Sequence, residues 1–554
     1  MNAIRSLLLF FPLLLSAHDS QNLKHALYMM QNGTIEEALS RYQHYSESSG
    51  KHDFEALQQM GLVLLRQGIR SEDPMVFLLS LFGAGLSGSS SSLEILERGL
   101  MQPDPQIQMI SLHFITKMED DRVDEILNIA MSSDFLSTRM EAAYYMAQKK
   151  HPHAVGQIEG LMQRLPPFFR PYFPSLFALI GTSDATTVLK RLMDDLDPQV
   201  RVESILNAAR LGRDDFLPTL RKRLTHCSSA EVEACAYAMG VLKDSSSIKL
   251  LKRLASSGSN NVKIAAILSL NTLGDRSFCS TLESMALNYN PHAITALSKY
   301  PESCETLAQL VKSKDLQIRL NASLSLLEHR DERSLPGIEE ILISDARDLA
   351  FYPFPSVGRT IACWKAVPSA ELRSNDQSID LSLSHSLRLQ VLNESLQLPE
   401  ESFLKLAKKL FNRKQLDLIP TLISLLENLR TPEAIALLKE GCKKIDAPLI
   451  RDYCHLALYR LKEPGPYEEH LNMWIMNQKD GELIRLRPLL PWKLRLESEY
   501  TLTPEETSQL LVDSFIAVAS RQDEKSIDFL IKAIKLGNPL NRYALVGLLM
   551  RATE

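Results

Sequence analysis

Apolar residues recur along most of the chain at the spacing of one face of an α-helix. With Val200 as the reference position, the residues four, five, eight and eleven places later are Ser204, Ile205, Ala208 and Leu211, all small or apolar. Steps of this size bring side chains onto one helical face. A glycine turn and a second amphipathic run follow, so the pattern predicts a helical hairpin.

The hairpin pattern recurs at intervals of 31 residues. Its reference positions are Ile107, Thr138, Phe169, Val200, Glu231 and Val262, followed with some drift by Ala293, Ile318, Leu349, Leu387, Leu418, Ile450, Ile484, Leu511 and Leu540. One hairpin cannot bury its own apolar stripe, so neighbouring hairpins must stack and share a continuous core. The sequence therefore predicts an all-α fold, an α-solenoid of stacked helical hairpins.

The turn into the second helix of each hairpin carries the most specific motif. Leu-Asp-Pro-Gln-Val-Arg at 196–201 and Lys-Asp-Leu-Gln-Ile-Arg at 314–319 match an Asp-x-x-Val-Arg pattern. On these residues the chain resembles the HEAT-repeat family, in the short form also found in phycobilin-lyase-type repeats. The resemblance covers residues 93–345 well and 386–554 more loosely. It implies a right-handed superhelix of the HEAT/armadillo type.

The resemblance also implies a structural ladder of charged residues. In the family, the arginine after the reference position typically hydrogen-bonds to turn aspartates along the stack, and such charge-assisted bonds are strong when partly buried. The matching residues here are Asp104, Arg139, Arg170, Asp197, Arg201, Lys263, Asp315, Arg319, Arg388 and Arg451. We expect them to stabilise the repeats rather than to form a binding site.

Residues 1–17 have the three parts of a secretory signal. One cation precedes an apolar run from Leu7 to Leu15, and small residues follow it. The run is too short to span a bilayer, which favours export of a mature chain that starts near His18. The destination would be the periplasm of a bacterium or the extracellular medium. The alternative is an apolar first helix, which would leave the chain in the cytoplasm.

Residues 18–72 differ from the repeats. Apolar spacing predicts three helices, near 26–30, 35–42 and 54–67, and Gly-Thr-Ile-Glu-Glu-Ala at 33–38 resembles the turn of a tetratricopeptide unit. A terminal unit has to cover the exposed core of a solenoid. We therefore expect this segment to be an N-terminal helical cap.

Two interruptions divide the array. Residues 73–92 hold an apolar run followed by Gly-Ala-Gly-Leu-Ser-Gly and four serines, a composition that predicts a flexible linker. The glycines match G-x-G-x-x-G, but a phosphate-binding turn needs a parallel sheet around it. Residues 346–385 form a divergent repeat with a polar insertion at 369–380, which we expect to be a loop on the binding face. Degenerate repeats then occupy residues 386–554.

Composition argues against several functional classes. The 62 Lys and Arg residues and 67 Asp and Glu residues give a net charge of −5, which does not suit a protein that mainly binds nucleic acid. No stretch of the mature chain is apolar enough for a transmembrane segment. The 13 histidines are scattered without H-E-x-x-H, and the seven cysteines form no C-x-x-C pair. We expect no metal, no cofactor and no catalytic residue, with most cysteines buried.

A basic stripe is the strongest predicted surface feature. Seven cations lie in register on three successive first helices: Lys190, Arg191, Arg221, Lys222, Arg223, Lys252 and Arg253. Such a stripe could bind an acidic peptide or a phosphorylated ligand. The alternative is a solvated face whose charge is balanced by nearby aspartates at 194, 195, 214 and 215.

Pro-Pro-Phe-Phe-Arg-Pro-Tyr-Phe-Pro at 166–174 is the other candidate. Exposed aromatic side chains on a rigid turn make good anchors for a partner. The same residues could instead fill the core where prolines shorten a helix.

These observations favour an exported, non-enzymatic scaffold or adaptor that binds a protein or peptide along its curved surface. One alternative is a phycobilin-lyase-like enzyme or chaperone that holds a small ligand in the solenoid groove. A nucleic-acid-binding solenoid ranks third, because the chain is acidic and is expected to be exported.

Overall fold

The computed structural model describes residues 21–344, 349–368, 381–413, 415, 417–444, 447–485 and 504–554. The expected signal peptide at 1–17 and the polar insertion at 369–380 lie outside the described residues. The chain separates into two compact units. Unit 1 comprises 1–145, 455–488 and 501–554, and unit 2 comprises 146–454 and 489–500.

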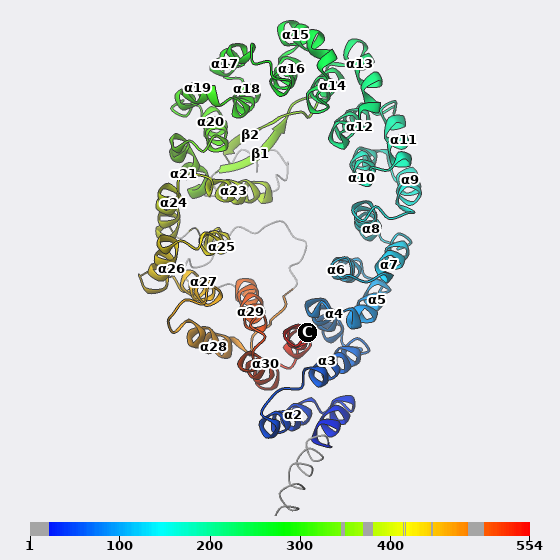
Figure 1. Ribbon diagram of the computed structural model, residues 1–554, viewed down its shortest axis with the longest axis vertical. Helices are drawn as coiled ribbons and strands as arrows, with labels where there is room; N and C mark the ends of the chain where they lie inside the picture. The colour runs from blue at the N-terminus through cyan, green and yellow to red at the C-terminus, as the bar shows by residue number, and fades with distance from the viewer. Residues whose placement is uncertain are drawn as a thin grey trace, which may run out of the picture. The chain divides into compact units, whose positions relative to one another are not determined.

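Unit 1 is built from helices at both ends of the chain (Figure 1). Its N-terminal part is helical at 21–31 and continues with α2 (Ile35–Ser49), α3 (Phe54–Gly68), α4 (Pro74–Ser87), η1 (Ser90–Ser92), α5 (Leu93–Leu100), α6 (Pro105–Ile115) and α7 (Arg122–Ala130). Its C-terminal part holds α28 (Tyr467–Gln478), α29 (Pro504–Ala519), α30 (Glu524–Leu536) and α31 (Asn541–Ala552). The helices α8 (Leu136–Gln148) and α27 (Pro448–Arg460) contain the points where the chain passes from one unit to the other.

Unit 2 contains the regular repeats (Figure 1). The first helices of successive hairpins are α9 (Ala154–Arg164), α11 (Ser183–Leu192), α13 (Leu217–His226), α15 (Ile248–Ser257), α17 (Cys279–Leu287), α19 (Cys304–Leu310) and α21 (Leu335–Ile343). The second helices are α10 (Phe173–Ile180), α12 (Pro198–Leu211), α14 (Ser229–Val241), α16 (Asn260–Thr272), α18 (Pro291–Ala296) and α20 (Leu316–Glu328). Short 3₁₀ turns η2 (Pro167–Tyr172), η3 (Asp214–Phe216), η4 (Ser245–Ser247), η5 (Leu297–Lys299), η6 (Pro301–Ser303) and η7 (Glu332–Ser334) connect them. The unit ends with α23 (Leu381–Ser395), α24 (Glu400–Asn412), α25 (Ile419–Leu429) and α26 (Pro432–Lys444).

Local sequence explains where the second helices start. Asp197 is the N-cap of α12, and its carboxylate accepts a hydrogen bond from the backbone N–H of Gln199 at 2.8 Å. Pro198 follows at the first helical position, where a missing N–H costs nothing. Asp104 and Asp315 cap α6 and α20 in the same way. The Asp-x-x-Val-Arg motif is therefore a helix start signal.

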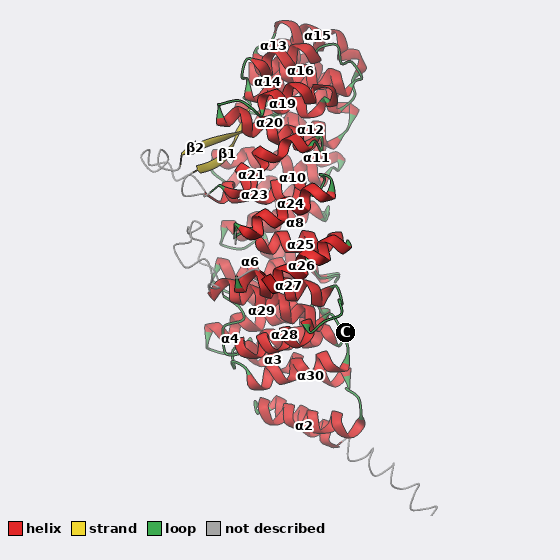
Figure 2. Cartoon of the chain, turned by 90° about the vertical axis from the view of Figure 1, so that its left-hand side faces the viewer, coloured by secondary structure: helices red, strands yellow, loops and turns green. Residues whose placement is uncertain are grey.

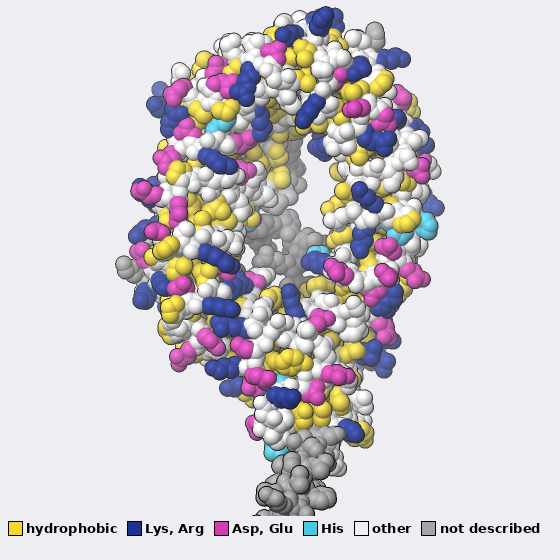
Figure 3. All heavy atoms as spheres, in the orientation of Figure 1, with side chains coloured by type: hydrophobic (Ala, Val, Ile, Leu, Met, Phe, Trp, Pro, Cys, Tyr) yellow, Lys and Arg dark blue, Asp and Glu magenta, His cyan; other side chains and the backbone are white. Residues whose placement is uncertain are grey.

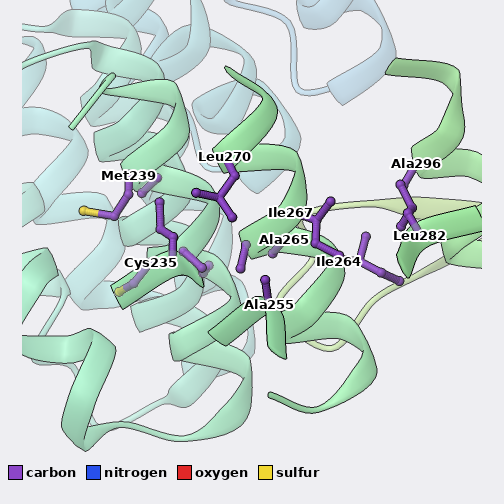
Figure 4. Packing of buried hydrophobic residues seen from close by; sticks show 14 of the residues in the cluster. Cys235, Met239, Ala255, Ile264, Ala265, Ile267, Leu270, Leu282 and Ala296 are labelled. Atoms are coloured by element: carbon purple, nitrogen blue, oxygen red, sulfur yellow. The ribbon is translucent and has the colours of Figure 1, made fainter. Parts of the chain in front are cut away.

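The core of unit 2 runs through consecutive second helices. Each second helix from α10 to α20 packs against the next one, and α13 and α15 pack against α14 and α16. Buried Ile264, Ile267 and Leu270 of α16 belong to one apolar cluster with residues of α14, α15, α17 and α18 (Figure 4). This stacking confirms the prediction of an α-solenoid of helical hairpins.

Residues 349–368 depart from the helical pattern. They form two antiparallel strands, β1 (Leu349–Pro355) and β2 (Ala362–Pro368), drawn in yellow in Figure 2. The prediction of a divergent helical repeat is wrong for these residues. Prolines at 353, 355 and 368 lack the N–H that a helix interior needs, and the aromatic and β-branched residues between them favour strands.

The prediction of a flexible linker at 83–92 is also wrong. Asp73 caps α4 by accepting a hydrogen bond from the N–H of Met75, and the helix runs through Gly83 and Gly85 to Ser87. Gly88 ends the helix in the left-handed conformation at φ 70°. The first two glycines belong to a helix because other helices approach them closely.

Gly85 faces Phe114 of α6, whereas the helix that approaches Gly83 comes from the other end of the chain. Within unit 1, α31 packs against both α3 and α4. A Cβ atom at Gly547 of α31 would lie 2.0 Å from the carbonyl oxygen of Gly83, and a Cβ atom at Gly61 would lie 2.6 Å from Met550. Gln58 on α3 also hydrogen-bonds to Thr553 at 3.1 Å. Glycine at these positions lets the helix backbones meet.

No helix among the described residues combines the length and the apolar character that a membrane span requires.

Candidate functional site

The basic stripe is largely neutralised by ion pairs. Lys190 lies 2.9 Å from Asp215, and Lys252 lies 2.7 Å from Asp275. Arg221 donates two hydrogen bonds to Asp244, at 2.7 and 2.8 Å. Each of these three pairs links a first helix to the turn before the next first helix. The stripe therefore joins neighbouring repeats as well as facing solvent.

The remaining stripe cations fall into two groups. Arg191 pairs with Glu159, and Arg223 pairs with both Asp194 and Glu231. Lys222 and Arg253 are exposed and form no ion pair with another described residue. Lysine, arginine, aspartate and glutamate side chains are interspersed over the face shown in Figure 3. Two of the seven cations are thus left to attract an acidic ligand.

The pairs shift the ionisation of the aspartates that they contain. The hydrogen bonds from Arg221 hold the pKa of Asp244 well below its ordinary value, although burial opposes this shift. The hydrogen bond from Lys252 lowers the pKa of Asp275 in the same way. Both carboxylates are ionised at neutral pH and strengthen the stack there.

The structural ladder is only partly as expected. Arg170 does pair with a turn aspartate of the next repeat, Asp195, at 2.6 Å. Arg201 instead donates to the turn carbonyls of Asp195 and Leu196 and pairs with Glu231 at 3.0 Å. Arg319 repeats this arrangement with the carbonyls of residues 313 and 314 and with a glutamate at 340. The arginines thus tie the turns to the neighbouring repeat.

The expected aspartate partners are wrong in three cases. The carboxylates of Asp104, Asp197 and Asp315 are used as helix caps, and ion pairs to them are absent among the described residues. Buried Arg388 donates to Asp417, to Gln415 and to the carbonyl oxygen of Leu342. Three further members form no ion pair within the described part of the chain: Arg139, Lys263 and Arg451.

The aromatic turn at 166–174 divides between surface and core. Phe168 and Tyr172 are 68% and 63% exposed, whereas Phe173 is fully buried. The rings of Phe168 and Phe169 are tilted by 34° to each other, with centroids 4.1 Å apart. Phe173 therefore fills the core, and the role of the exposed Phe168 and Tyr172 as partner anchors stays a prediction.

A site that the sequence analysis missed lies on the second helices. The turn between β1 and β2, at residues 356–361, rests on α14 and surrounds the carboxylate of Glu233, which is fully buried. The hydroxyl of Ser356, the N–H of Gly358 at 2.9 Å and the hydroxyl of Thr360 at 2.6 Å all donate to this carboxylate. Three donors compensate for its removal from water.

The hairpin is held along four second helices of unit 2. Beside Glu233 on α14, Arg359 pairs with Glu203 of α12 at 2.7 Å. His292 of α18 donates to the carbonyl oxygen of Phe354 at 3.0 Å. Burial lowers the pKa of this histidine, which favours the neutral ring.

The fourth helix holds the backbone of β2 directly. The side-chain amide of Asn321 on α20 donates to the carbonyl oxygen of Trp364 and accepts from its N–H, both at 2.8 Å. A two-bond contact of this kind recognises an extended backbone irrespective of its side chain. The second helices of unit 2 therefore bind an extended polypeptide, which here is part of the same chain.

The only sequence signal for this site was indirect. The interval from Leu349 to Leu387 is longer than the 31-residue repeat, which showed that extra chain is inserted. Nothing in a 31-residue pattern shows which helices that extra chain contacts. Glu233 is one of two glutamates on α14, with Glu231, and nothing in the sequence distinguishes it.

The seven cysteines are free thiols. Cys235, Cys363 and Cys454 are buried, and burial raises the pKa of each. Within the described ranges, no group of three or more His, Cys, Asp and Glu residues could hold a metal ion.

The stacked hairpins define a helical-repeat protein of the HEAT-like α-solenoid class. No family model matches the sequence, and no curated protein does. Among solved structures, the chain is similar to the complex of CpcE and CpcF of phycocyanin lyase from Nostoc sp. PCC7120, with 19% identity and a TM-score of 0.29 over 39% of this chain and 92% of that chain.

Two larger proteins show similarity over most of the chain. The karyopherin Kap121p bound to the extreme C-terminus of the protein phosphatase Cdc14p has 15% identity and a TM-score of 0.36, over 92% of this chain and 63% of that one. UNC-45 from Drosophila melanogaster has 12% identity and a TM-score of 0.33, over 96% of this chain and 87% of that one. All three TM-scores are low, so function has to be inferred from the residues of this chain.

Proposed function

We propose that this protein is an exported, non-enzymatic scaffold that binds an extended segment of a partner protein along its second helices. The proposal rests on the hydrogen bonds and the ion pair that join the β-hairpin to α12, α14, α18 and α20. Side chains of these helices contact the backbone of the hairpin as well as its side chains. Backbone contacts suit a surface that accepts more than one sequence.

The same helices offer rigid positions for those contacts. Asn321 is buried to 1% exposure, and its amide also donates to the carbonyl oxygen of Gln317, which orients it. Glu233 lies on α14, which packs against both α12 and α16. Preorganised polar groups reduce the entropy that binding costs.

Selection of displayed peptides against the full chain tests the proposal. Hydrogen exchange should show that enriched peptides protect the second helices α10–α20 more than the first helices α11–α21. Absence of enrichment, or protection confined to the first helices, would contradict a peptide-binding function.

A pair of matched variants checks whether the second helices hold backbone. In Asn321→Ala, exchange of the Trp364 N–H should increase. Asn288→Ala is the control, because this exposed amide at the end of α17 bonds only within its own helix, to the carbonyl oxygen of Ser284. Equal exchange of the Trp364 N–H in both variants would show that Asn321 does not hold the backbone of β2.

Export is tested separately, by fractionation and N-terminal sequencing in the native host. We expect a mature chain that starts near His18 and lies outside the cytoplasm. A small ligand that copurifies with the protein and absorbs visible light would instead favour the lyase-like alternative.

A further inference from the structure

The turn of the β-hairpin shows which chemistry its binding site accepts. Residues 356–360 read Ser-Val-Gly-Arg-Thr, and four of these five meet the helices through named contacts. The hydroxyls of Ser356 and Thr360 and the N–H of Gly358 converge on Glu233. Arg359 reaches Glu203. A ligand for this site therefore needs two hydroxyls, a glycine and a cation.

Glycine is required at the centre of the turn. A Cβ atom at position 358 would lie 2.6 Å from the backbone carbonyl oxygen of Ala230 and 2.7 Å from Cβ of Glu233. Neither group can move without shifting α14. Val357, by contrast, is 65% exposed, so the site places no demand on that side chain.

The hairpin is anchored at its base as well as at its turn. Ala350 and Phe351 are buried, and Ser384 of α23 bonds both the N–H and the carbonyl oxygen of Phe351. Along β1, exposure increases towards the turn, where Phe354 is 41% exposed. The contacts at the turn are mainly polar, so water can replace them when the turn leaves.

We infer that the site around Glu233 and Glu203 binds a hydroxyl-x-Gly-Arg-hydroxyl segment of a partner protein, which displaces the turn of the chain's own hairpin. This inference rests on the proposed function and names the segment and its place. Two carboxylates on α12 and α14 select a basic segment, whereas the base of the hairpin remains in position.

Competition between the turn and a free peptide tests the inference. The probe is a fluorescent peptide of residues 354–362, Phe-Pro-Ser-Val-Gly-Arg-Thr-Ile-Ala. In the native chain the attached turn competes at an effective concentration on the order of millimolar. In the G358A chain the turn no longer fits, so fluorescence anisotropy should show binding at least about 10-fold tighter than to the native chain.

Two controls define the site. A peptide that itself carries G358A should not bind, because its methyl group meets the same carbonyl oxygen. Adding Glu233→Gln to the G358A chain should abolish binding of the native peptide, since the amide cannot accept all three hydrogen bonds. Equal affinity of the peptide for the native and G358A chains, or binding that survives Glu233→Gln, would overturn the inference.

Arg359→Glu provides a second way to release the turn. Its side chain is 44% exposed, so the change adds no buried volume, and it places a carboxylate beside Glu203. If G358A does not fold by circular dichroism, the same 10-fold gain is expected in this variant. No gain there would equally overturn the inference.

Other outcomes remain distinguishable. Dimers formed when native and G358A chains are mixed would assign the site to the hairpin of a second copy and overturn the inference. Displayed peptides could also bind the second helices without competing with the probe. That result would overturn the inference about the Glu233 site but would still support a peptide-binding function.

Discussion

Unit 2 and unit 1 pack their helices by different means. In unit 2, consecutive second helices such as α14 and α16 are neighbours in the sequence, and they meet through leucine, isoleucine and alanine side chains and at Gly240, where a Cβ atom would lie 2.6 Å from Cα of Ser269. In unit 1, α4 and α31 come from opposite ends of the chain and meet through Gly83 and Gly547. The contacts of unit 2 therefore join helices that are close in the sequence, whereas the contact of α4 with α31 is long-range.

The difference determines how each region tolerates change. A repeat in unit 2 contacts mainly its two neighbours, so damage there stays local. The contact of α31 with α3 and α4 joins two separate parts of the chain, so damage there affects all of unit 1. Glycine backbones in contact also have no room for an added atom, whereas a leucine cluster can rearrange.

The largest effect is expected at the contact between α4 and α31. Gly547→Val should separate α31 from α4 and destabilise unit 1 by about 4 kcal/mol, because even one Cβ atom would meet the Gly83 carbonyl oxygen at 2.0 Å. Hydrogen exchange should rise in α3, α4 and α31 and stay unchanged in α14 and α16. Gly156→Ala in α9 is the control, since nothing lies within 4 Å of its Cβ position. A uniform rise in exchange would mean that the two units do not unfold independently.

A smaller loss is expected from the buried charge of unit 2. Arg388→Ala leaves the Leu342 carbonyl oxygen without this donor and Asp417 without its arginine, although His385 still lies 3.5 Å from that carboxylate, and should cost about 3 kcal/mol in the free energy of unfolding. Arg451→Ala, at an exposed position of the same expected ladder, should change it by less than about 0.5 kcal/mol. Urea denaturation of both variants measures the difference. Similar losses of unfolding free energy in both variants would show that burial does not distinguish the members of the ladder.

The pair of Arg221 with Asp244 makes unit 2 sensitive to acid. Because the pKa of Asp244 is lower in the folded than in the unfolded chain, its contribution is present above the unfolded pKa of about 4 and is lost as the pH falls further. Asp244→Asn should therefore cost about 1 kcal/mol at pH 7 and progressively less below pH 4. Thermal melting between pH 3 and pH 7 measures this, with exposed Asp214→Asn as the control. A difference that does not change with pH would contradict the assigned ionisation.

The smallest effect is expected from the two unpaired stripe cations. Lys222→Ala and Arg253→Ala should each change the free energy of unfolding by less than about 0.5 kcal/mol, because neither side chain has an ion-pair partner among the described residues. The reversal of both to glutamate should alter the salt dependence of peptide binding if the stripe attracts acidic ligands. Unchanged salt dependence would leave the stripe with a structural role alone.

The repeats were predictable because their information is local. The sequence around Asp197 and Asp315 contains a cap, the start of a helix and an arginine within six residues, and the same order recurs elsewhere. Spacing alone could not show that Arg201 would prefer turn carbonyls and Glu231 to Asp197. Capping does not by itself exclude an ion pair, since Asp244 caps its own turn and still pairs with Arg221, so only the structure shows which partners lie within reach of Arg201.

The long-range contacts were not predictable for a physical reason. A glycine-rich segment such as 83–88 has the same composition whether it is a linker or a close helix crossing, and only Gly547 distinguishes the two. The hairpin posed the same problem, because Ser356 and Glu233 are 123 positions apart. Neither partner has a repeating pattern that points to the other.

The pairing of α3 with α31 has a consequence for the order of biosynthesis. Gln58 and Met550, which lie in these two helices, are 492 positions apart in the chain. A ribosome that adds about 5–20 residues per second needs roughly half a minute to a minute and a half between them. Throughout that interval the apolar faces of α3 and α4 that pack against α31 remain uncovered. Nascent chains are therefore expected to depend on chaperones until translation ends.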